Sequence, residues 1–170
     1  MSHVTIFRPC SDTAQYVFDQ VSTLIAYYVQ QGLMVSQSPA RLRQLAENDN
    51  LVVATQSHRV IACAAITVEY PDGSKEFGGW AVDPDFQDKK IGKQLLQNIL
   101  QKHCGVFVFA VANQHSAKIF QHLGAREIAT IDIHPDVFIV CKTCNCDKSR
   151  LSAKAQCVDT FHDLRPLMDA

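Results

Sequence analysis

The chain has 170 residues, a length typical of a single domain that buries roughly two thirds of its unfolded surface. Its net charge is −1 with acidic and basic residues well mixed, so neither a nucleic-acid-binding surface nor steering of acidic substrates is expected. The sequence shows no apolar run of membrane-spanning length, no basic-then-apolar leader and an odd number of cysteines, 7, so we expect a cytoplasmic protein with reduced thiols.

The first half of the chain alternates between strand and helix patterns. Ser11 and Asp12 are candidate N-caps for a first helix, whose apolar side chains recur at helical spacing over residues 14–29. Ser38 followed by Pro39 predicts the start of a second helix, because proline is favoured at the first helical position. In chain order, the elements expected here are a strand at 4–7, the two helices, the second ending at 47, and strands at 51–55, 60–68 and 76–82.

The second half continues this alternation and ends in a polar segment. Residues 106–111 are apolar without polar alternation, as in a strand that is covered on both faces. An amphipathic helix with its apolar face between Ile91 and Leu100 precedes this strand, and a helix at 114–122 follows it and ends at Gly124. Two last strands are expected near 128–133 and 137–141, a single domain over 1–144, and a tail that packs on it or extends from it over 145–170.

Residues 84–96 are the most informative segment, because a basic, glycine-containing loop leads there from the strand at 76–82 directly into an amphipathic helix. The first N–H groups of a helix and the positive end of its dipole face whatever lies in front of such a loop. Gly92 carries no side chain, and Lys89 and Lys90 add positive charge. The segment therefore predicts a pyrophosphate-binding site. The alternative is an ordinary strand-to-helix turn with solvated lysines.

Two patterns carry a resemblance to a known family. The pattern Gln-x-x-Lys-x-Gly at 87–92 resembles the acetyl-CoA-binding motif of the GNAT N-acetyltransferase superfamily, which usually has a glycine where this chain has Lys90. The pattern Asn-x-x-Ser-x-x-x-Phe-x-x-x-Gly at 113–124 resembles the second signature of that family. The resemblance covers roughly residues 3–143 and implies an α/β GNAT fold, with a mixed, mostly antiparallel central sheet of about seven strands flanked by about four helices.

The resemblance also implies which residues contact acetyl-CoA. Loop N–H groups and lysines would hold the pyrophosphate, and backbone groups at the end of the preceding strand would polarise the thioester carbonyl. Polar residues of the second signature would orient the cofactor. The implied acetyl-CoA-binding residues are Ala81, Val82, Gln87, Asp88, Lys89, Lys90, Ile91, Gly92, Lys93, Asn113, Ser116 and Phe120.

Transfer of an acetyl group to an amine needs a group that accepts the proton of the amine. Several family members place a general base at the position of Glu76, which makes Glu76 the candidate catalytic residue. The alternative is an exposed strand-end carboxylate paired with Lys75 or with a lysine across the strand, and His115 is a weaker base candidate. Gly78 and Gly79 in the same strand indicate either a bulge, through which the family admits the pantetheine arm, or close packing against a large neighbour such as the adjacent tryptophan.

Phe120 departs from the family, which often has a tyrosine there whose hydroxyl reaches the sulfur of CoA as a general acid. Phenylalanine keeps the packing and removes the proton donor. Because thiolate is a tolerable leaving group near neutral pH, we expect a slower enzyme rather than an inactive one. The alternative function is a non-catalytic GNAT-like domain that senses acyl-CoA, and Lys90 in place of glycine favours the same alternative.

A narrower resemblance, carried by residues 24–42 and 60–65, is to the acetyltransferase domain of N-acetylglutamate synthases. That family usually has an arginine just before the serine that caps the second helix, where this chain has Gln37. Glutamine lacks the charged, bidentate grip of arginine on a carboxylate, which argues against glutamate as the acceptor. We therefore expect acetyl transfer from acetyl-CoA to the primary amine of a small molecule, amino acids included, with Gln37 near the substrate and the protein a monomer or homodimer.

The cysteines near the C-terminus form another unusual pattern. Tetrahedral zinc takes four soft ligands, and a Cys-x-x-Cys pair supplies two of them on one turn. A second pair of this kind is missing, so no metal is expected. The alternative is a structural zinc site that would make the tail a zinc-dependent interaction segment. The residues concerned are Cys141, Cys144, Cys146 and Cys157, with His162 beyond them.

Overall fold

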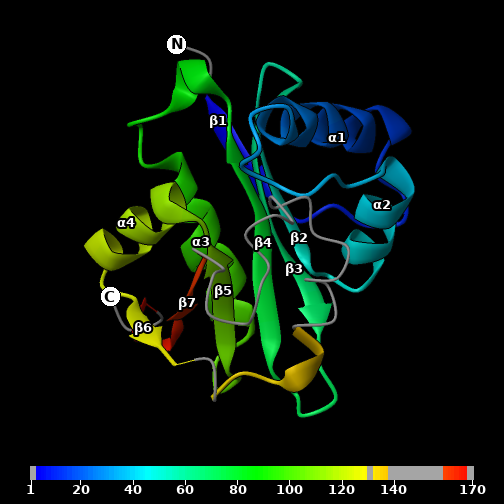
Figure 1. Ribbon diagram of the computed structural model, residues 1–170. Helices are drawn as coiled ribbons and strands as arrows, with labels where there is room; N and C mark the ends of the chain where they lie inside the picture. The colour runs from blue at the N-terminus through cyan, green and yellow to red at the C-terminus, as the bar shows by residue number, and fades with distance from the viewer. Residues whose placement is uncertain (1–2, 130–131, 138–158, 168–170) are drawn as a thin grey trace. The chain divides into compact units, whose positions relative to one another are not determined.

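The computed structural model describes residues 3–129, 132–137 and 159–167. Within them lie seven β-strands and four α-helices, and the chain divides into two compact units. No helix in these described ranges is both long and apolar enough to cross a membrane. The first unit comprises Met1–Val68 and Phe77–Cys104, and the second comprises Glu69–Glu76 and Gly105–Ala170 (Figure 1).

The strands predicted for the first half of the chain all form. Strands β1 (Val4–Phe7), β2 (Leu51–Gln56) and β3 (Arg59–Glu69) pair in sequence order, and both pairings are antiparallel. Strand β4 (Lys75–Val82) is the next strand beside β3. The α/β class and the mostly antiparallel pairing predicted from the sequence are confirmed.

Helices α1 (Gln15–Val29) and α2 (Pro39–Glu47) pack on one face of these strands (Figure 1). Val53 of β2 belongs to their shared core, so Val52, which points to the opposite face of the strand, lies on the side of α3 (Ile91–Lys102), a helix that contacts β2. Both faces of β2 are therefore covered. The buried residues of the core between the strands and the helices α1 and α2 are Val17, Phe18, Val21, Leu24, Ile25, Leu42, Leu45, Ala46, Leu51, Val53, Val60, Cys63, Ala65 and Ala81.

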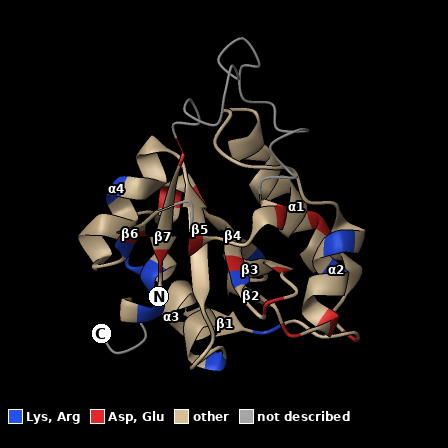
Figure 2. Ribbon diagram, turned by 60° about the horizontal axis from the view of Figure 1, so that its bottom comes forward, with Lys and Arg blue, Asp and Glu red and all other residues tan. Residues whose placement is uncertain are grey.

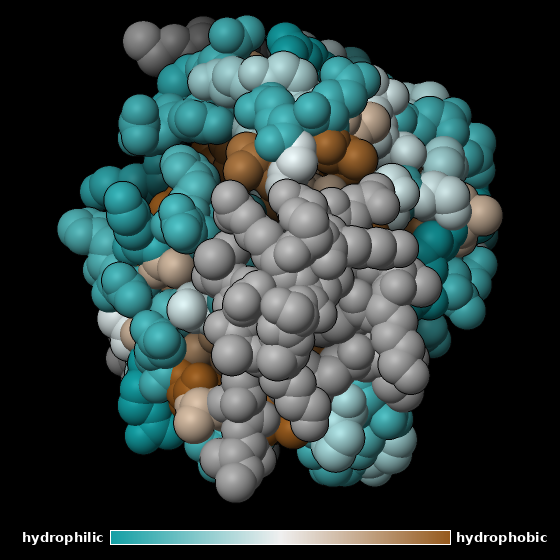
Figure 3. Space-filling view, in the orientation of Figure 1, coloured by the Kyte–Doolittle hydropathy of each residue, from teal (hydrophilic) through white to brown (hydrophobic). Residues whose placement is uncertain are grey.

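The outer faces of α1 and α2 are polar, as their amphipathic patterns predict. Figure 2 shows basic positions on α2 and an acidic position on α1, and Figure 3 shows a mostly hydrophilic surface over both helices. Tyr16 and Tyr27 are the half-exposed aromatic residues of α1.

One of the two predicted helix starts is confirmed and the other is wrong. Ser38 caps α2, and its Oγ accepts a hydrogen bond from the Arg41 N–H at 3.2 Å. Ala14, rather than Ser11 or Asp12, holds the N-cap position of α1, and it makes no side-chain cap bond. The physical reason is a turn before the helix, in which Thr13 N donates to Cys10 O at 3.0 Å and places both predicted caps ahead of the first helical turn.

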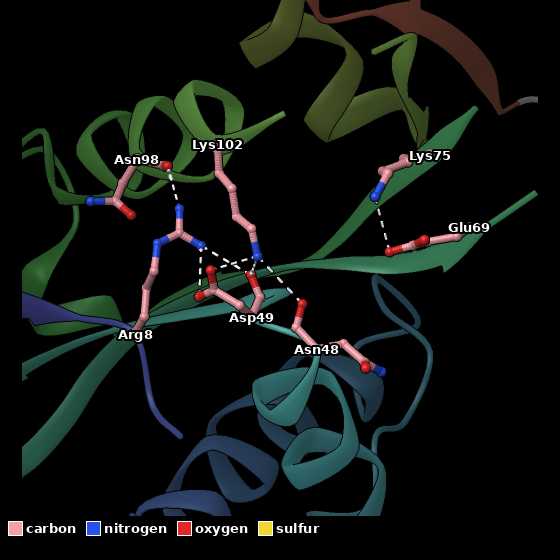
Figure 4. Close-up of polar contacts among 7 residues, drawn as sticks. All are labelled: Arg8, Asn48, Asp49, Glu69, Lys75, Asn98 and Lys102. Atoms are coloured by element: carbon pink, nitrogen blue, oxygen red, sulfur yellow. Dashed lines mark hydrogen bonds and ion pairs between the residues drawn. The ribbon is translucent and has the colours of Figure 1, made fainter. Parts of the chain in front are cut away.

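A polar network fixes the C-terminal half of α3 against the turn that follows α2 (Figure 4). Lys102 Nζ lies 2.5 Å from Oδ2 of Asp49 and donates to the Asp49 carbonyl at 2.8 Å. Arg8 donates to the Asn98 carbonyl at 2.6 Å and to the Asp49 carbonyl at 3.1 Å. Ion pairs at this exposure contribute roughly 0–1 kcal/mol each, so the main consequence is the fixed direction of α3, whose other end forms the predicted phosphate loop.

The second unit is built from three strands and α4 (Gln114–Leu123). Strand β5 (Val108–Ala112) pairs antiparallel with β7 (Thr160–Asp163), which also pairs antiparallel with β6 (Arg126–Ile128). Helix α4 contacts all three strands. It ends at Gly124, whose φ of +99° is the left-handed conformation that the predicted glycine C-cap requires.

The last two strands differ from the prediction. Strand β6 ends at Ile128, and the described residues 132–137 form turns rather than the end of a strand expected at 128–133. The strand expected at 137–141 lies outside the described residues except for its first residue. Strand β7 instead comes from the segment interpreted as a tail. Its Thr160 Oγ1 lies 2.8 Å from His162 Nε2, and Arg165 lies 2.7 Å from the buried Asp163, so polar side chains mask this strand in a hydropathy pattern. The division into a domain at 1–144 and a tail at 145–170 stays a prediction.

Candidate functional site

The connection from β4 to α3 is fixed by hydrogen bonds that begin at its first residue, Asp83. Asp83 N donates to the Ile61 carbonyl at 2.8 Å, and Asp83 Oδ1 accepts from the Asp85 N–H at 3.0 Å, which caps the short 3-10 helix η1 (Pro84–Phe86). The other carboxylate oxygen of Asp83 forms an ion pair with Arg59 of β3. The loop therefore leaves the strand in a fixed direction.

The loop reaches α3 through residues in left-handed conformation. Asp88 has φ +59° and Lys90 has φ +62°, values that residues with side chains rarely adopt. Lys90 is the N-cap residue of α3 and makes no side-chain cap bond. Helix geometry leaves the first N–H groups of α3, from Ile91 to Lys93, without intrahelical partners, so they face outward as donors for an anion. Binding of a pyrophosphate by these N–H groups stays a prediction.

The left-handed backbone conformation of Lys90 explains why the motif usually has glycine at this position. An L-residue in the left-handed region costs about 1–2 kcal/mol, and glycine does not incur this cost. We expect Lys90→Gly to stabilise the fold by about 0.5–1 kcal/mol after the greater flexibility of glycine in the unfolded chain is subtracted. For a chain of this size the melting temperature should rise by about 1–4 °C.

Thermal unfolding followed by circular dichroism measures this effect, and Lys90→Ala is the matched control. Alanine removes the same charge but keeps the Cβ atom, so it should give no comparable gain. Equal melting temperatures for the two variants would show that the left-handed conformation of Lys90 carries no strain.

Gly92 is enclosed by protein atoms. A Cβ atom at this position would lie 3.3 Å from the indole of Trp80 and 3.3 Å from a methyl group of Val82, and Trp80 Nε1 donates to the Gly92 carbonyl at 3.1 Å. In a phosphate-binding loop, a glycine at this position lets the ligand approach the backbone closely. The structure adds a second reason for glycine, which is room for Trp80.

The other predicted cofactor contacts in and around the loop differ in exposure. Ile91 and Ala81 are buried and serve the core, whereas Lys93 is exposed on the first turn of α3. Lys89 folds back on the loop, donating to the Asp85 carbonyl at 2.7 Å and lying 4.5 Å from the ring centre of Phe86. The Lys89 charge therefore first stabilises the loop itself.

Gln87 and the end of β4 share a partner that the motif does not reveal. Gln87 Nε2 donates to the Tyr28 hydroxyl at 2.9 Å, and that hydroxyl donates to the carbonyl of Val82. Tyr28 comes from α1 and stands 59 positions before Gln87 in the sequence. Neither spacing nor periodicity signals such a contact.

Strand β4 is irregular at its glycine pair. Gly79 has φ +57°, outside the extended region, and a Cβ atom on Gly78 would lie 3.1 Å from Thr67 of β3. The close neighbour is thus Thr67 rather than the adjacent Trp80, which packs on Gly92 instead. The geometry agrees with a local irregularity of the kind expected from paired glycines in a strand.

Half-buried Glu76 pairs with buried Tyr70 in the second unit. The Tyr70 hydroxyl donates to Glu76 Oε2 at 2.6 Å, and the ring of Tyr70 stacks on Phe109 with centroids 5.8 Å apart. Burial raises the pKa of Glu76, and the hydrogen bond from Tyr70 opposes this effect. Lys75, the pairing partner considered from the sequence, lies with its Nζ 3.0 Å from Glu69 (Figure 4). A carboxylate with a raised pKa has the basicity that a general base needs.

The second signature forms the start of α4 in the same unit. Asn113 is the N-cap residue, and its Oδ1 accepts from the N–H groups of His115 and Ser116 at 3.0 Å each. Ser116 Oγ donates back to Oδ1 of Asn113 at 3.2 Å, and His115 is exposed. Phe120 is 3% exposed and stacks on His162 with ring centroids 5.8 Å apart. Asn113 and Ser116 thus have a capping role, and their contact with a cofactor stays a prediction.

Gln37 lies half-buried in the connection between α1 and α2, where its carbonyl accepts from Ser22 Oγ at 2.8 Å. Its contact with substrate stays a prediction. No group of three or more potential metal ligands occurs in the described part of the chain. The four cysteines of the alternative zinc site lie outside the described residues, and His162 is fully buried against Phe120.

Comparisons with known proteins agree with the fold. Residues 47–124 match the family model of the acetyltransferase (GNAT) domain. No curated protein matches the chain at a significant level.

Solved structures are similar over nearly the whole chain. N-acetylglutamate synthase from Neisseria gonorrhoeae, solved with coenzyme A and N-acetyl-glutamate, is 17% identical with a TM-score of 0.71, and the match covers 95% of this chain and 35% of that one. This chain therefore spans about a third of that protein. A Mycobacterium tuberculosis protein solved with CoA and NLQ is 18% identical with a TM-score of 0.66, covering 93% of this chain and 96% of that one.

A third similar structure is diaminobutyrate acetyltransferase from Paenibacillus lautus, solved with L-2,4-diaminobutyric acid and coenzyme A. It is 15% identical with a TM-score of 0.64, and the match covers 95% of this chain and 94% of that one. At these identities the likeness establishes the shared fold.

Proposed function

We propose that this chain, whose residues 47–124 match the acetyltransferase (GNAT) domain, transfers the acetyl group of acetyl-CoA to the primary amine of a small molecule such as an amino acid. The observation that carries the proposal is the N-terminus of α3. There the motif residue Lys90 adopts the left-handed conformation, makes no side-chain cap bond and leaves the first N–H groups of the helix as donors for a pyrophosphate.

The chemistry follows from the residues present. Glu76, with its raised pKa, would accept a proton from the ammonium form of the acceptor, and the free amine would attack the thioester carbonyl. Backbone groups of Ala81 and Val82 would orient the thioester, and the CoA thiolate would leave. The co-crystallised ligands of the similar structures, N-acetyl-glutamate and L-2,4-diaminobutyric acid, support an acceptor of amino-acid size. The proposal includes a cytoplasmic location and no metal cofactor.

A screen of amino acids and small amines, with detection of released thiol, tests the transferase activity. Calorimetric titration with coenzyme A tests cofactor binding separately. Thiol release with at least one amine supports the proposal, and the absence of both CoA binding and thiol release would reject it.

A non-catalytic acyl-CoA sensor is the second candidate function, and Phe120 is the observation that favours it. The position seven residues after Asn113 carries a buried phenyl ring where the family often has a tyrosine. A sensor would bind CoA and release no thiol with any amine. The same residue allows the two functions to be separated by substitution.

We expect Phe120→Tyr to raise turnover by about 3- to 30-fold. A positioned proton donor contributes about 10²–10⁴-fold when proton transfer limits the rate, and the gain should be smaller here because thiolate leaves readily. Against the gain stands a cost of about 1–3 kcal/mol if the hydroxyl finds no partner in a site packed for phenyl. Turnover compared at equal folded fraction decides the question. An unchanged or lower rate in a folded variant would mean that another group handles the thiolate or that the domain is a sensor.

A further inference from the structure

Tyr28 is joined to both sides of the turn that leads from β4 into the phosphate loop. Its hydroxyl donates to the carbonyl of Val82, the last residue of β4, and accepts from Nε2 of Gln87, the first residue of the motif, at 2.9 Å. A single hydroxyl on α1 thus contacts the strand end and the loop at once. Val82 and Gln87 belong to the predicted cofactor site, whereas Tyr28 lies outside both family signatures.

We propose that Tyr28 is a positioning residue for coenzyme A binding, which holds Gln87 and the end of β4 in the geometry that the cofactor needs. The inference rests on the proposed function, because it concerns the same loop. It adds a residue from a helix outside both signatures to the machinery of that loop.

The chemistry of the contact requires a hydroxyl group. Val82 offers a carbonyl that needs a donor, and Gln87 offers an amide N–H that needs an acceptor, and among ring side chains only tyrosine meets both needs with one atom. Tyr28 packs against the core between the helices and the strands, so its ring has little freedom. Burial raises the pKa of Tyr28, and the bond from Gln87 opposes this, so the hydroxyl keeps its proton at neutral pH.

The loop needs the hydrogen bonds of Tyr28 because two of its residues adopt an energetically unfavourable backbone conformation. Asp88 and Lys90, one and three positions after Gln87, both adopt left-handed conformations. Conformations of this kind persist only where surrounding contacts hold them. Without the Tyr28 contact, Gln87 and the loop would sample other arrangements, and the cofactor would have to select the binding geometry from among them.

The test uses Tyr28→Phe, which keeps the ring and removes the hydroxyl oxygen, with Tyr27→Phe as the matched control. Tyr27 is adjacent on α1, its ring contacts that of Tyr28 at a centroid distance of 5.0 Å, and it is 47% exposed. Calorimetric titration with coenzyme A, well below the melting temperature of each variant, should show binding weakened about 3- to 30-fold in Tyr28→Phe and less than about 2-fold in Tyr27→Phe.

A double-mutant cycle with Gln87→Ala separates positioning from general stabilisation. If Tyr28 acts through Gln87, the alanine substitution should weaken CoA binding much less in the Tyr28→Phe background than in wild type. Independent, multiplying effects would show that Tyr28 does not act through Gln87. A role in folding alone would lower the melting temperature of Tyr28→Phe and leave its CoA affinity unchanged.

The outcomes distinguish this inference from the proposed function. Wild-type CoA affinity in folded Tyr28→Phe, with CoA binding in the wild type, overturns only the role of Tyr28. Absence of CoA binding in the wild type overturns both. If Tyr28→Phe does not fold, a second experiment takes its place. Hydrogen exchange of the backbone amides at 86–93 is then compared between the wild type and Gln87→Ala, a substitution at an exposed position. Faster exchange in Gln87→Ala supports the positioning role of the Tyr28 contact, and equal exchange rejects it.

Discussion

Glu76→Gln is expected to lower turnover at neutral pH by about 10²–10⁴-fold, because the amide cannot accept the proton of the acceptor amine. Affinity for coenzyme A should stay close to that of the wild type, since the phosphate loop lies in a different part of the chain. The defect should shrink as pH rises, because the amine then loses its proton unaided. A pH–rate profile of kcat/KM for both proteins measures this expectation.

Glu69→Gln is the matched control, since Glu69 is the carboxylate 3.0 Å from Lys75 and precedes Glu76 across the same turn. Its turnover should stay within a few-fold of wild type. Equal defects in the two variants, or a pH–rate profile unchanged by Glu76→Gln, would leave Glu76 with a structural role in its contact with Tyr70.

The raised pKa of Glu76 also has a consequence for stability, with a definite sign. In the window between the ordinary glutamic acid pKa and the raised value, the folded chain keeps a proton that the unfolded chain has lost. The free energy of unfolding of the wild type therefore includes a contribution from the protonation of Glu76 that decreases as pH rises through this window. Glu76→Gln has no such contribution. The difference in melting temperature between variant and wild type should shift in favour of the variant as pH rises from about 4 to about 8.

The parts of the fold that could be predicted are those marked by hydrophobic period and helix ends. The stripe over 14–29, the Ser38–Pro39 pair and Gly124 at the end of α4 each mark an element that the structure contains. Strand β7 could not be found in this way, because its Thr-Phe-His-Asp sequence buries polar side chains. Asp163 is 2% exposed and is held by Arg165 at 2.7 Å, a contact that hydropathy does not register.

The candidate site shows the same limit. The loop and its glycine could be found because a motif fixes backbone conformation over a few adjacent residues. Tyr28 and Tyr70 could not be found, because each acts through one hydrogen bond that no sequence pattern records. Tyr28 contacts Gln87 of the motif, and Tyr70 contacts the candidate base Glu76. A tyrosine at an apolar position of a helix, such as Tyr28, is predicted to be a core residue. Only the structure shows that its hydroxyl has hydrogen-bond partners.

Gly92→Glu is expected to weaken coenzyme A binding on the order of 10²-fold or more. The carboxylate would stand on the first turn of α3, where the N–H groups face the proposed pyrophosphate, and two like charges about 4 Å apart repel by about 4 kcal/mol at an effective dielectric constant near 20. The helix itself should tolerate the charge, because an acidic side chain near a helix N-terminus interacts favourably with the dipole. Calorimetric titration with coenzyme A at several salt concentrations measures the loss and its electrostatic part.

Gly92→Gln separates charge from size, because it adds nearly the same volume without the carboxylate. Both variants place a Cβ atom 3.3 Å from Trp80 and Val82, so both should lose a similar amount of stability as these neighbours shift by a few tenths of an ångström. If the pyrophosphate lies at this helix terminus, glutamate must weaken CoA binding far more than glutamine, and added salt must narrow the gap. Equal losses in the two variants would trace the effect to displaced Trp80 packing. Wild-type affinity in both folded variants would place the cofactor away from α3.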